Sequence, residues 1–317
     1  MIRRAPVSVD VSDVVADIMT AARPDEPQDP VYSRWWLERP MRPDSIRVLA
    51  LWESEGRPVA YTEGGHLPWR VEPERFIWME LYALPEVLAG PLLGEVQDGF
   101  IEQALEDEPN VLNYQVWEDA EREITSIEKR GFVRDRLSKA WELDLVRHGE
   151  RLLAEREKGR ARMAAEGVTL ATLAADQDPD KLPKLLRLIN LSQRDIPTTV
   201  PIHDETMEET VRWLEAPVLR HDRYWIAREG DDIVGLSYLQ YPPQRGNVWT
   251  GYTASLPSHR GRGIARAEKM ETLGQAVDLG VTRVRTDNDE ENAPMLHINE
   301  QLGYERIPGV LSFLKRL

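Results

Sequence analysis

Two glycines flanked by three arginines mark the stretch of this sequence that is best suited to chemistry. The run Arg260-Gly-Arg-Gly263 follows an extended segment and precedes a helical pattern that begins at Ile264. The first backbone N–H groups of such a helix lack partners within the helix, and the helix dipole adds partial positive charge there. Glycine lets a ligand approach the backbone closely, and Arg262 and Arg266 add full charges to that of Arg260. The pattern predicts a site for a phosphate or pyrophosphate.

The spacing excludes two common phosphate loops. A Walker A loop needs Lys-Ser or Lys-Thr after its last glycine, whereas Ile264-Ala265 stands there. A dinucleotide loop needs a third small residue at position 266, which is Arg. The loop is therefore suited to a different phosphate ligand, and a basic surface turn explains the same residues.

A second patterned segment begins at Val281. Val281 to Thr286 is typical of a short strand, and a helix is predicted after Asn292, which is a good N-cap. Pro294 is tolerated in the first turn, because its missing N–H would be unpaired anyway. Gly303 is suited to the C-cap.

Together the two segments resemble the signatures of the GNAT N-acetyltransferase superfamily. Arg260-x-x-Gly263-x-Ala265 is similar to its acyl-CoA pyrophosphate motif, and Asn292 with the ending Leu302-Gly-Tyr304 is similar to its second signature. The resemblance covers residues 168–317. It implies acetyl-CoA as co-substrate, and an α/β (α+β) fold with a mixed, centrally splayed sheet flanked by helices.

The resemblance also implies which residues hold the co-substrate. The pantetheine arm would pair with the exposed edge of a strand, at Thr253, Ala254 and Ser255. The remaining contacts would come from the loop, the start of its helix and two asparagines: Arg260, Gly261, Arg262, Gly263, Ile264, Ala265, Arg266, Asn288 and Asn292.

The group that protonates the leaving thiolate is where the sequence departs from this family. Many members have Tyr four residues before the Gly of the second signature, and this chain has Asn299 there. An amide has no useful acidity, although it can donate a hydrogen bond to sulfur or hold a water. Tyr252 and Tyr304 are the candidates to take over this function, and each is also suited to core packing.

The acceptor side is expected from two helices, over residues 176–194 and 203–214, and the loop between them. Glu208 and Glu209 are candidate general bases, with Asp204 and His203 as further candidates; an exposed helix face explains the same residues. Large rigid rings can also shape an acceptor pocket, and five tryptophans are candidates besides being suited to core packing: Trp35, Trp36, Trp213, Trp225 and Trp249.

The N-terminal half repeats the pattern of the C-terminal half. Pro85 and Pro257 lie 172 positions apart, and Gly131 and Gly303 lie the same distance apart. One constant offset across two such points indicates an internal repeat, and hence two fused GNAT folds.

The register shows what the first copy lacks. Leu88, Ala89, Gly90, Pro91 and Leu93 stand where the second copy has its loop, so the positive charges are gone and Pro91 removes a backbone donor. The expected division is a degenerate GNAT-like domain over 1–145, a linker helix over 146–167 and a GNAT domain with the acetyl-CoA site over 168–317. The first copy would pack against the second and form one wall of the cleft; two working sites are the alternative.

Composition limits the remaining classes. A net charge of −15 argues against general affinity for nucleic acid and suits an amine substrate. With no cysteine, disulfides and a Cys acyl-enzyme are excluded, and the six His residues lack metal-ligand spacing, so no metal is expected. No signal peptide or membrane-spanning run of ~20 apolar residues is present, which favours the cytoplasm.

The sequence therefore predicts an acetyl-CoA-dependent N-acetyltransferase that acts on a primary amine, expected to be a small molecule, as a monomer or homodimer. A protein Lys or N-terminal acceptor is an alternative. A non-catalytic acyl-CoA-binding sensor or assembly protein is another, because the loop would bind CoA in either case.

Overall fold

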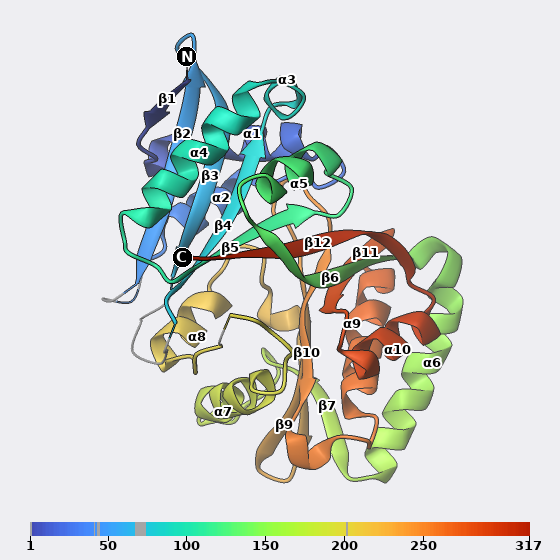
Figure 1. The fold of residues 1–317 in the computed structure, drawn as a ribbon. Coiled ribbons are helices and arrows are strands. Elements are labelled where there is room, and N and C mark those ends of the chain that lie inside the picture. The colour runs from blue at the N-terminus through green and yellow to red at the C-terminus, as the bar shows by residue number, and fades with distance from the viewer. Residues whose placement is uncertain (1, 41, 43–44, 67–73, 201) are drawn as a thin grey trace.

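The computed structural model describes residues 2–40, 42, 45–66, 74–200 and 202–317. These residues form one sheet of 12 strands with helices on both faces, as Figure 1 shows. The strand order is β1-β2-β3-β4-β5-β12-β6-β11-β10-β9-β8-β7. Neighbouring strands run antiparallel except for the pairs β4 with β5 and β10 with β11, which are parallel.

The N-terminal half supplies six strands and five helices, in addition to a short 3-10 turn, over the described residues. They are β1 (Ile2–Ala5), α1 (Ser12–Ala22), α2 (Pro30–Glu38), β2 (Ile46–Ser54), β3 (Arg57–His66), β4 (Phe76–Ala83), α3 (Pro85–Leu88), α4 (Leu92–Leu105), β5 (Val111–Trp117), α5 (Glu121–Glu128) and β6 (Val133–Asp144).

Helix α6 (Leu145–Ala165) then leads to the second half. That half comprises β7 (Val168–Thr172), α7 (Lys181–Gln193), α8 (Met207–Leu214), β8 (Tyr224–Glu229), β9 (Asp232–Gln240), β10 (Trp249–Ser255), α9 (Ile264–Asp278), β11 (Arg283–Asp289), α10 (Ala293–Leu302) and β12 (Glu305–Arg316). The predicted caps of α10 are confirmed: Asn292 accepts a hydrogen bond from the backbone N–H of Met295, and Gly303 has φ 88°.

The predicted repeat is visible in the order of the sheet. Six strands of one half mirror six of the other, and β5 and β11, like β6 and β12, begin 172 positions apart. However, the last strands are exchanged. Strand β12 pairs with β5 of the first half, and β6 pairs with β11 of the second. Each half of the sheet is therefore completed by the other half's last strand, and the division at 1–145, 146–167 and 168–317 stays a prediction.

The helices cover the two faces of the sheet in the same way in each half. Along β4, the buried Ile77 and Met79 belong to the core under α4, while the alternate residues Trp78 and Tyr82 face α1 and α2. In the second half α9 covers one face, and α7 and α8 lie against the other.

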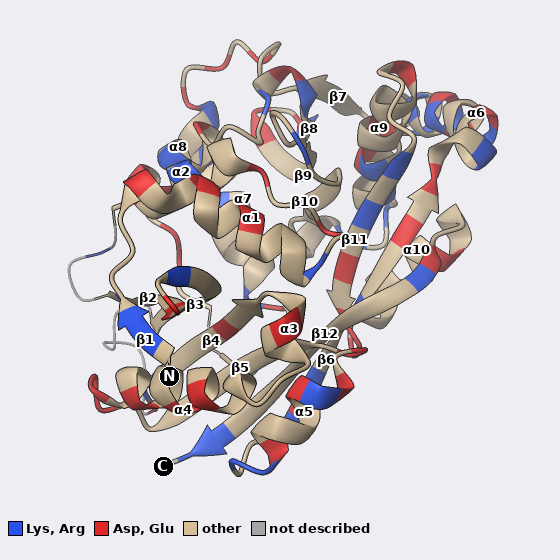
Figure 2. Cartoon of the chain, turned by 90° about the horizontal axis from the view of Figure 1, so that it is seen from above, with Lys and Arg blue, Asp and Glu red and all other residues tan. Residues whose placement is uncertain are grey.

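The helix between the halves packs on the protein rather than lying free in solvent. Gly149 and Leu152 of α6 are buried, and a Cβ on Gly149 would lie 3.3 Å from Val277 of α9. Ion pairs of 2.6 Å join Arg160 to Glu271 and Arg156 to Asp278. Figure 2 shows acidic and basic residues together along α6. Helix α6 is therefore held against α9, the helix that begins directly after the glycine loop.

The parallel strand pairs differ between the halves. Strands β4 and β5 keep register over five residue pairs, from Phe76–Val111 to Glu80–Gln115. Strands β10 and β11 pair only at Trp249 and Arg285 and then separate. The gap that this splay opens in the second half is where a cleft forms.

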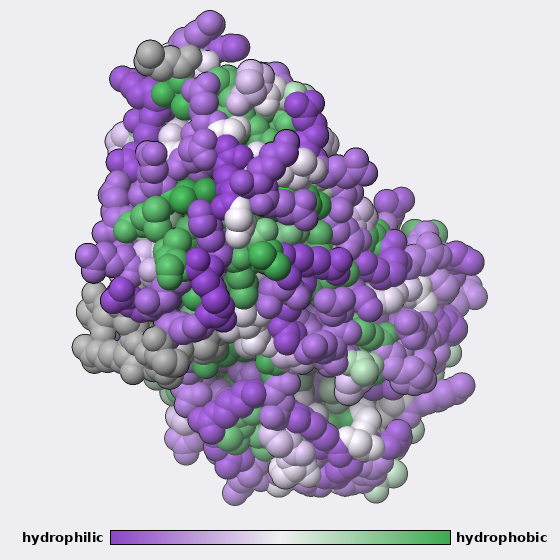
Figure 3. All heavy atoms as spheres, in the orientation of Figure 1, coloured by the Kyte–Doolittle hydropathy of each residue, from purple (hydrophilic) through white to green (hydrophobic). Residues whose placement is uncertain are grey.

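One face of the molecule can be judged from its hydropathy. Hydrophilic residues dominate the face seen in Figure 3, and apolar residues form small separate areas on it. None of the described helices combines the length and apolar character needed to cross a membrane.

Candidate active site

The glycine loop lies directly before α9, which begins at Ile264 as the sequence predicts. Gly261 and Gly263 have φ of 77° and 83°, a region that L-residues avoid. Gly263 is the N-cap of α9 and no side chain caps this helix, so its first N–H groups remain available. A Cβ on Gly261 would meet nothing within 4 Å. Open space beside uncapped N–H groups is what a pyrophosphate requires.

The loop lies at a cleft of about 1260 Å³ between the splayed strands β10 and β11. Nearly all predicted co-substrate contacts line it: Thr253, Ala254, Ser255, Arg260, Gly261, Gly263, Ile264, Ala265, Arg266, Asn288 and Asn292. Arg262 does not line it. Of the predicted catalytic residues, only Tyr252 lines the cleft, whereas Asn299, Tyr304, Glu208 and Glu209 do not.

All three loop arginines are paired with carboxylates. Arg260 contacts Asp195 at 2.7 Å, and Arg266 contacts Glu155 at 3.0 Å. Arg262 instead turns to Glu229, at 2.8 Å, and holds the pKa of that carboxyl at about 2, with His259 as a further cause. Arg260 and Arg266 are thus the loop cations that reach the cleft, and Arg262 stabilises the outer side of the loop.

Asn299 has a supporting position behind the cleft. It is fully buried, and its carbonyl oxygen accepts a hydrogen bond from Lys269 Nζ at 2.7 Å. Its amide donates to Asn288 Oδ1 at 2.8 Å, so Asn288 keeps its own NH2 donors, and Asn288 lines the cleft. Asn299 therefore orients Asn288 and does not itself reach the cleft.

The two tyrosines are placed differently. The Tyr252 hydroxyl contacts Ser192 Oγ at 2.9 Å at the cleft wall, and burial raises the pKa of Tyr252 above its ordinary value. Tyr304 is a core residue that is 5% exposed, with Lys269 Nζ 4.9 Å from its ring centroid. Tyr252 is the better placed of the two to act as an acid.

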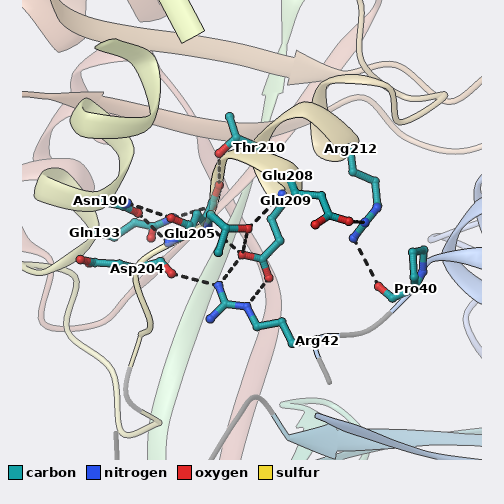
Figure 4. A network of polar contacts seen from close by, with 11 residues as sticks. Pro40, Arg42, Asn190, Gln193, Asp204, Glu205, Glu208, Glu209, Thr210 and Arg212 are labelled. Carbon is teal, nitrogen blue, oxygen red and sulfur yellow. Dashed lines mark hydrogen bonds and ion pairs between the residues drawn. The ribbon is translucent and has the colours of Figure 1, made fainter. Parts of the chain in front are cut away.

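The two predicted bases have structural partners, which Figure 4 shows. Glu209 forms a capping box with Thr206 at the start of α8 and also pairs with Arg42 of the first half. Glu208 pairs with Arg212 one turn later on the same helix, at 2.7 Å. Both glutamates thus have structural functions. Glu209 caps α8 and joins the two halves, and Glu208 pairs within the helix.

Several cleft residues escaped the sequence analysis. Asn113, Gln115, Arg136 and Ser138 of β5 and β6 form part of the wall, in keeping with the predicted contribution of the first half. The position of Arg136 and Ser138 follows from the strand exchange, for which the sequence carries no signal. Asp287 of β11 also lines the cleft, and Ser138 Oγ donates to it at 2.6 Å.

Comparisons with known proteins agree with this fold. The acetyltransferase (GNAT) family model matches residues 185–304. A tandem GNAT protein from the clavulanic acid biosynthesis pathway is similar over 100% of this chain and 98% of its own, with 17% identity and a TM-score of 0.74. A GCN5-related N-acetyltransferase from Sphaerobacter thermophilus has 16% identity and a TM-score of 0.65, with 99% and 95% of the chains covered.

A third similar structure is the glucosamine N-acetyltransferase region of a fungal multi-domain β-N-acetylglucosaminidase. It has 14% identity and a TM-score of 0.67, and covers 99% of this chain and 38% of that one. The chain thus has the tandem GNAT fold, with a GNAT domain in its second half, and the predicted fold class is confirmed. Acyl transfer is the general chemistry that this class indicates.

The buried Lys269 gives a prediction on stability. Burial lowers its pKa from 10.5 to about 7. Between these values the unfolded chain keeps a proton that the folded protein has lost, so stability rises with pH in this window. From pH 7 to pH 9 the gain is about 2 kcal/mol. Urea unfolding should show that Lys269→Met lacks this gain.

The comparison with wild type isolates one residue, because other titrating groups contribute equally to both proteins. The hydrogen bond that Asn299 loses in the variant is a cost that does not change with pH. The exposed Lys158→Met is the control and should keep the wild-type pH dependence. Equal slopes for all three proteins would mean that Lys269 stays charged when buried.

Proposed function

We propose that this protein is an N-acetyltransferase that moves an acetyl group from acetyl-CoA to a primary amine of a small molecule, in the cleft of its second half. The observation that carries the proposal is the cleft itself. At one place it joins the edge of a splayed strand, two glycines with positive φ and an uncapped helix N-terminus.

The residues fit acetyl-CoA, which supplies a thioester-activated acyl group when bound. The loop N–H groups with Arg260 and Arg266 would hold the pyrophosphate. Backbone N–H groups near Ala254 and Ser255 are the expected donors to the carbonyl oxygen, and both residues line the cleft. The Asn288 amide, fixed through Asn299 and Lys269, offers a further donor.

In the transfer, a C–N bond forms, the C–S bond breaks, the amine loses a proton and the sulfur gains one. Tyr252 is the candidate donor of that proton, since it lines the cleft and keeps its own proton at neutral pH. Asp287 is a carboxylate in the cleft that suits an approaching ammonium group. One of the similar structures is a glucosamine N-acetyltransferase region, which supports an amine acceptor by analogy of fold.

The test is incubation with acetyl-CoA and a panel of amines, including amino sugars, polyamines, amino acids and lysine peptides. Thiol release and mass spectrometry of the acceptor report turnover. We expect acetylation of a small amine. Acetylation of peptides alone would favour a protein acetyltransferase. Tight acetyl-CoA binding without turnover on any amine would favour an acyl-CoA sensor.

A further inference from the structure

A second cavity, of about 390 Å³, lies in the first half, between the sheet and helices α1 and α2. Its floor is made by alternate residues of two neighbouring strands, which point to one face of the sheet. Its walls come from the helices, and aromatic rings make up much of the lining: Tyr32, Trp36, Tyr61, Trp78 and Tyr82. Such a volume suits a small molecule.

Two carboxylates lie side by side on the floor. Glu63 of β3 and Glu80 of β4 are direct cross-strand neighbours. Glu63 is 7% exposed and accepts hydrogen bonds from Trp36 Nε1 at 3.0 Å and Tyr61 Oη at 2.9 Å. Glu80 accepts one from Tyr82 Oη at 2.5 Å. In the described part of the chain, neither carboxylate forms an ion pair with Lys or Arg.

Little positive charge compensates the two carboxyl groups of Glu63 and Glu80. Burial, with Glu80 as a second cause, raises the pKa of Glu63 to about 7, and burial also raises the pKa of Glu80. Arg47 lowers the pKa of Glu63 only as a lesser cause, and Arg39 and Arg47 stack on Trp36, at 3.9 and 5.7 Å from its ring centroid. Two adjacent buried carboxyls cannot both ionise readily without a cation between them.

The other half of the molecule supplies an internal comparison. Tyr238 and Tyr252 are the cross-strand pair of β9 and β10, and Tyr252 lies 172 positions after Glu80. Trp213 Nε1 donates to Tyr238 Oη at 3.0 Å, as Trp36 Nε1 does to Glu63. Equivalent cross-strand positions thus carry two tyrosines in the second half and two glutamates in the first. Burying two acids costs stability, so packing alone does not explain them.

We propose that the cavity of the first half binds a small organic ammonium ion. The ammonium group would lie against Glu63 and Glu80, and the rings of Trp78 and Tyr32 would contact its positive charge and its apolar substituent. This gives a ligand to the half that lacks the glycine loop, and it does not rest on the proposed acetyl transfer. Gln115 lines both cavities, so the two sites adjoin.

The test is calorimetric titration of the full chain with benzylamine and with benzyl alcohol, its neutral analogue. Benzylamine should bind at least about tenfold more tightly, since only the ammonium meets the carboxylates. Binding should be about tenfold tighter at pH 8 than at pH 6, because the cation must displace a proton from a group with a pKa near 7. Equal binding of both probes at both pH values would overturn the proposal.

Matched variants locate the probe. Glu63→Gln with Glu80→Gln should weaken benzylamine at least about tenfold and remove the pH dependence. Trp78→Leu tests the aromatic wall independently of the acids. The control is Glu102→Gln, an exposed carboxylate of α4 that lines neither cavity, which should change nothing. Asp287→Asn, in the cleft of the second half, reports whether the amine binds there instead. Loss of benzylamine binding in Asp287→Asn alone would place the amine in that cleft and overturn the proposal. Circular dichroism confirms that each variant is folded.

Discussion

Gly261→Glu should weaken acetyl-CoA binding about 100-fold or more, which corresponds to about 2.7 kcal/mol. The position lies at φ 77° with open space around its missing Cβ, so the new side chain would enter the volume that the pyrophosphate needs. Its carboxylate would repel the ligand's negative charge, and its Cβ would strain the left-handed backbone. Calorimetric titration with acetyl-CoA gives both the affinity and the stoichiometry.

The repeat offers a control at the equivalent position. Ala89 lies 172 positions before Gly261 and is exposed, so Ala89→Glu makes the same change of charge in the first half and should leave binding intact. Gly261→Ala separates strain from charge, and we expect a much smaller loss. Wild type should bind one acetyl-CoA per chain. A stoichiometry of two, with one site lost in Ala89→Glu, would show that the first half still binds CoA.

Local sequence was enough to predict the loop and its helix. Only glycine readily adopts the positive φ at positions 261 and 263, and Asn292 and Gly303 fix both ends of α10 through their own backbone preferences. The constant offset also predicted two related folds, because insertions would have disturbed it. These features depend on neighbours in the chain, which a single sequence shows directly.

The exchange of strands β6 and β12 could not be predicted from the sequence. Either strand presents the same alternation to the sheet whether it pairs within its own half or across. Pairing within a half and pairing across the halves differ only in how the strands are connected, and both give the same alternation of apolar and polar residues. The wall that Arg136 and Ser138 add to the cleft depends on this exchange and was missed with it.

Lys269 was missed for a different reason. Helix α9 lies between the sheet and α6, so residues from Ala267 to Gly274 are all buried and no polar face marks the outside. One-dimensional patterns predict that a charged residue in such a helix is exposed to solvent. The buried lysine also explains the orientation of the Asn299 side chain. Lys269 Nζ donates to Asn299 Oδ1, so the amide nitrogen of Asn299 points to Asn288 and donates to its oxygen.

Tyr252→Phe should lower kcat for acetyl transfer about 100-fold, with KM for acetyl-CoA changed less than about threefold. The variant removes one hydroxyl from the cleft wall and keeps the ring that packs there. Loss of a proton donor affects the step in which the C–S bond breaks and leaves co-substrate binding unchanged. Steady-state kinetics with the best amine of the panel separates the two parameters.

Two further variants distinguish a proton donor from a packing residue. Ser192→Ala removes the partner of the Tyr252 hydroxyl but not the hydroxyl, so kcat should fall only about tenfold. Tyr241 is largely buried, lies outside the cleft and stacks with Arg223, and Tyr241→Phe should leave kcat at the wild-type value.

An unchanged kcat in Tyr252→Phe would remove the only predicted acid that lines the cleft. The leaving thiolate would then depend on hydrogen bonding, for which the Asn288 amide is the group in place, and Asn288→Ala would become the variant with the larger loss of kcat.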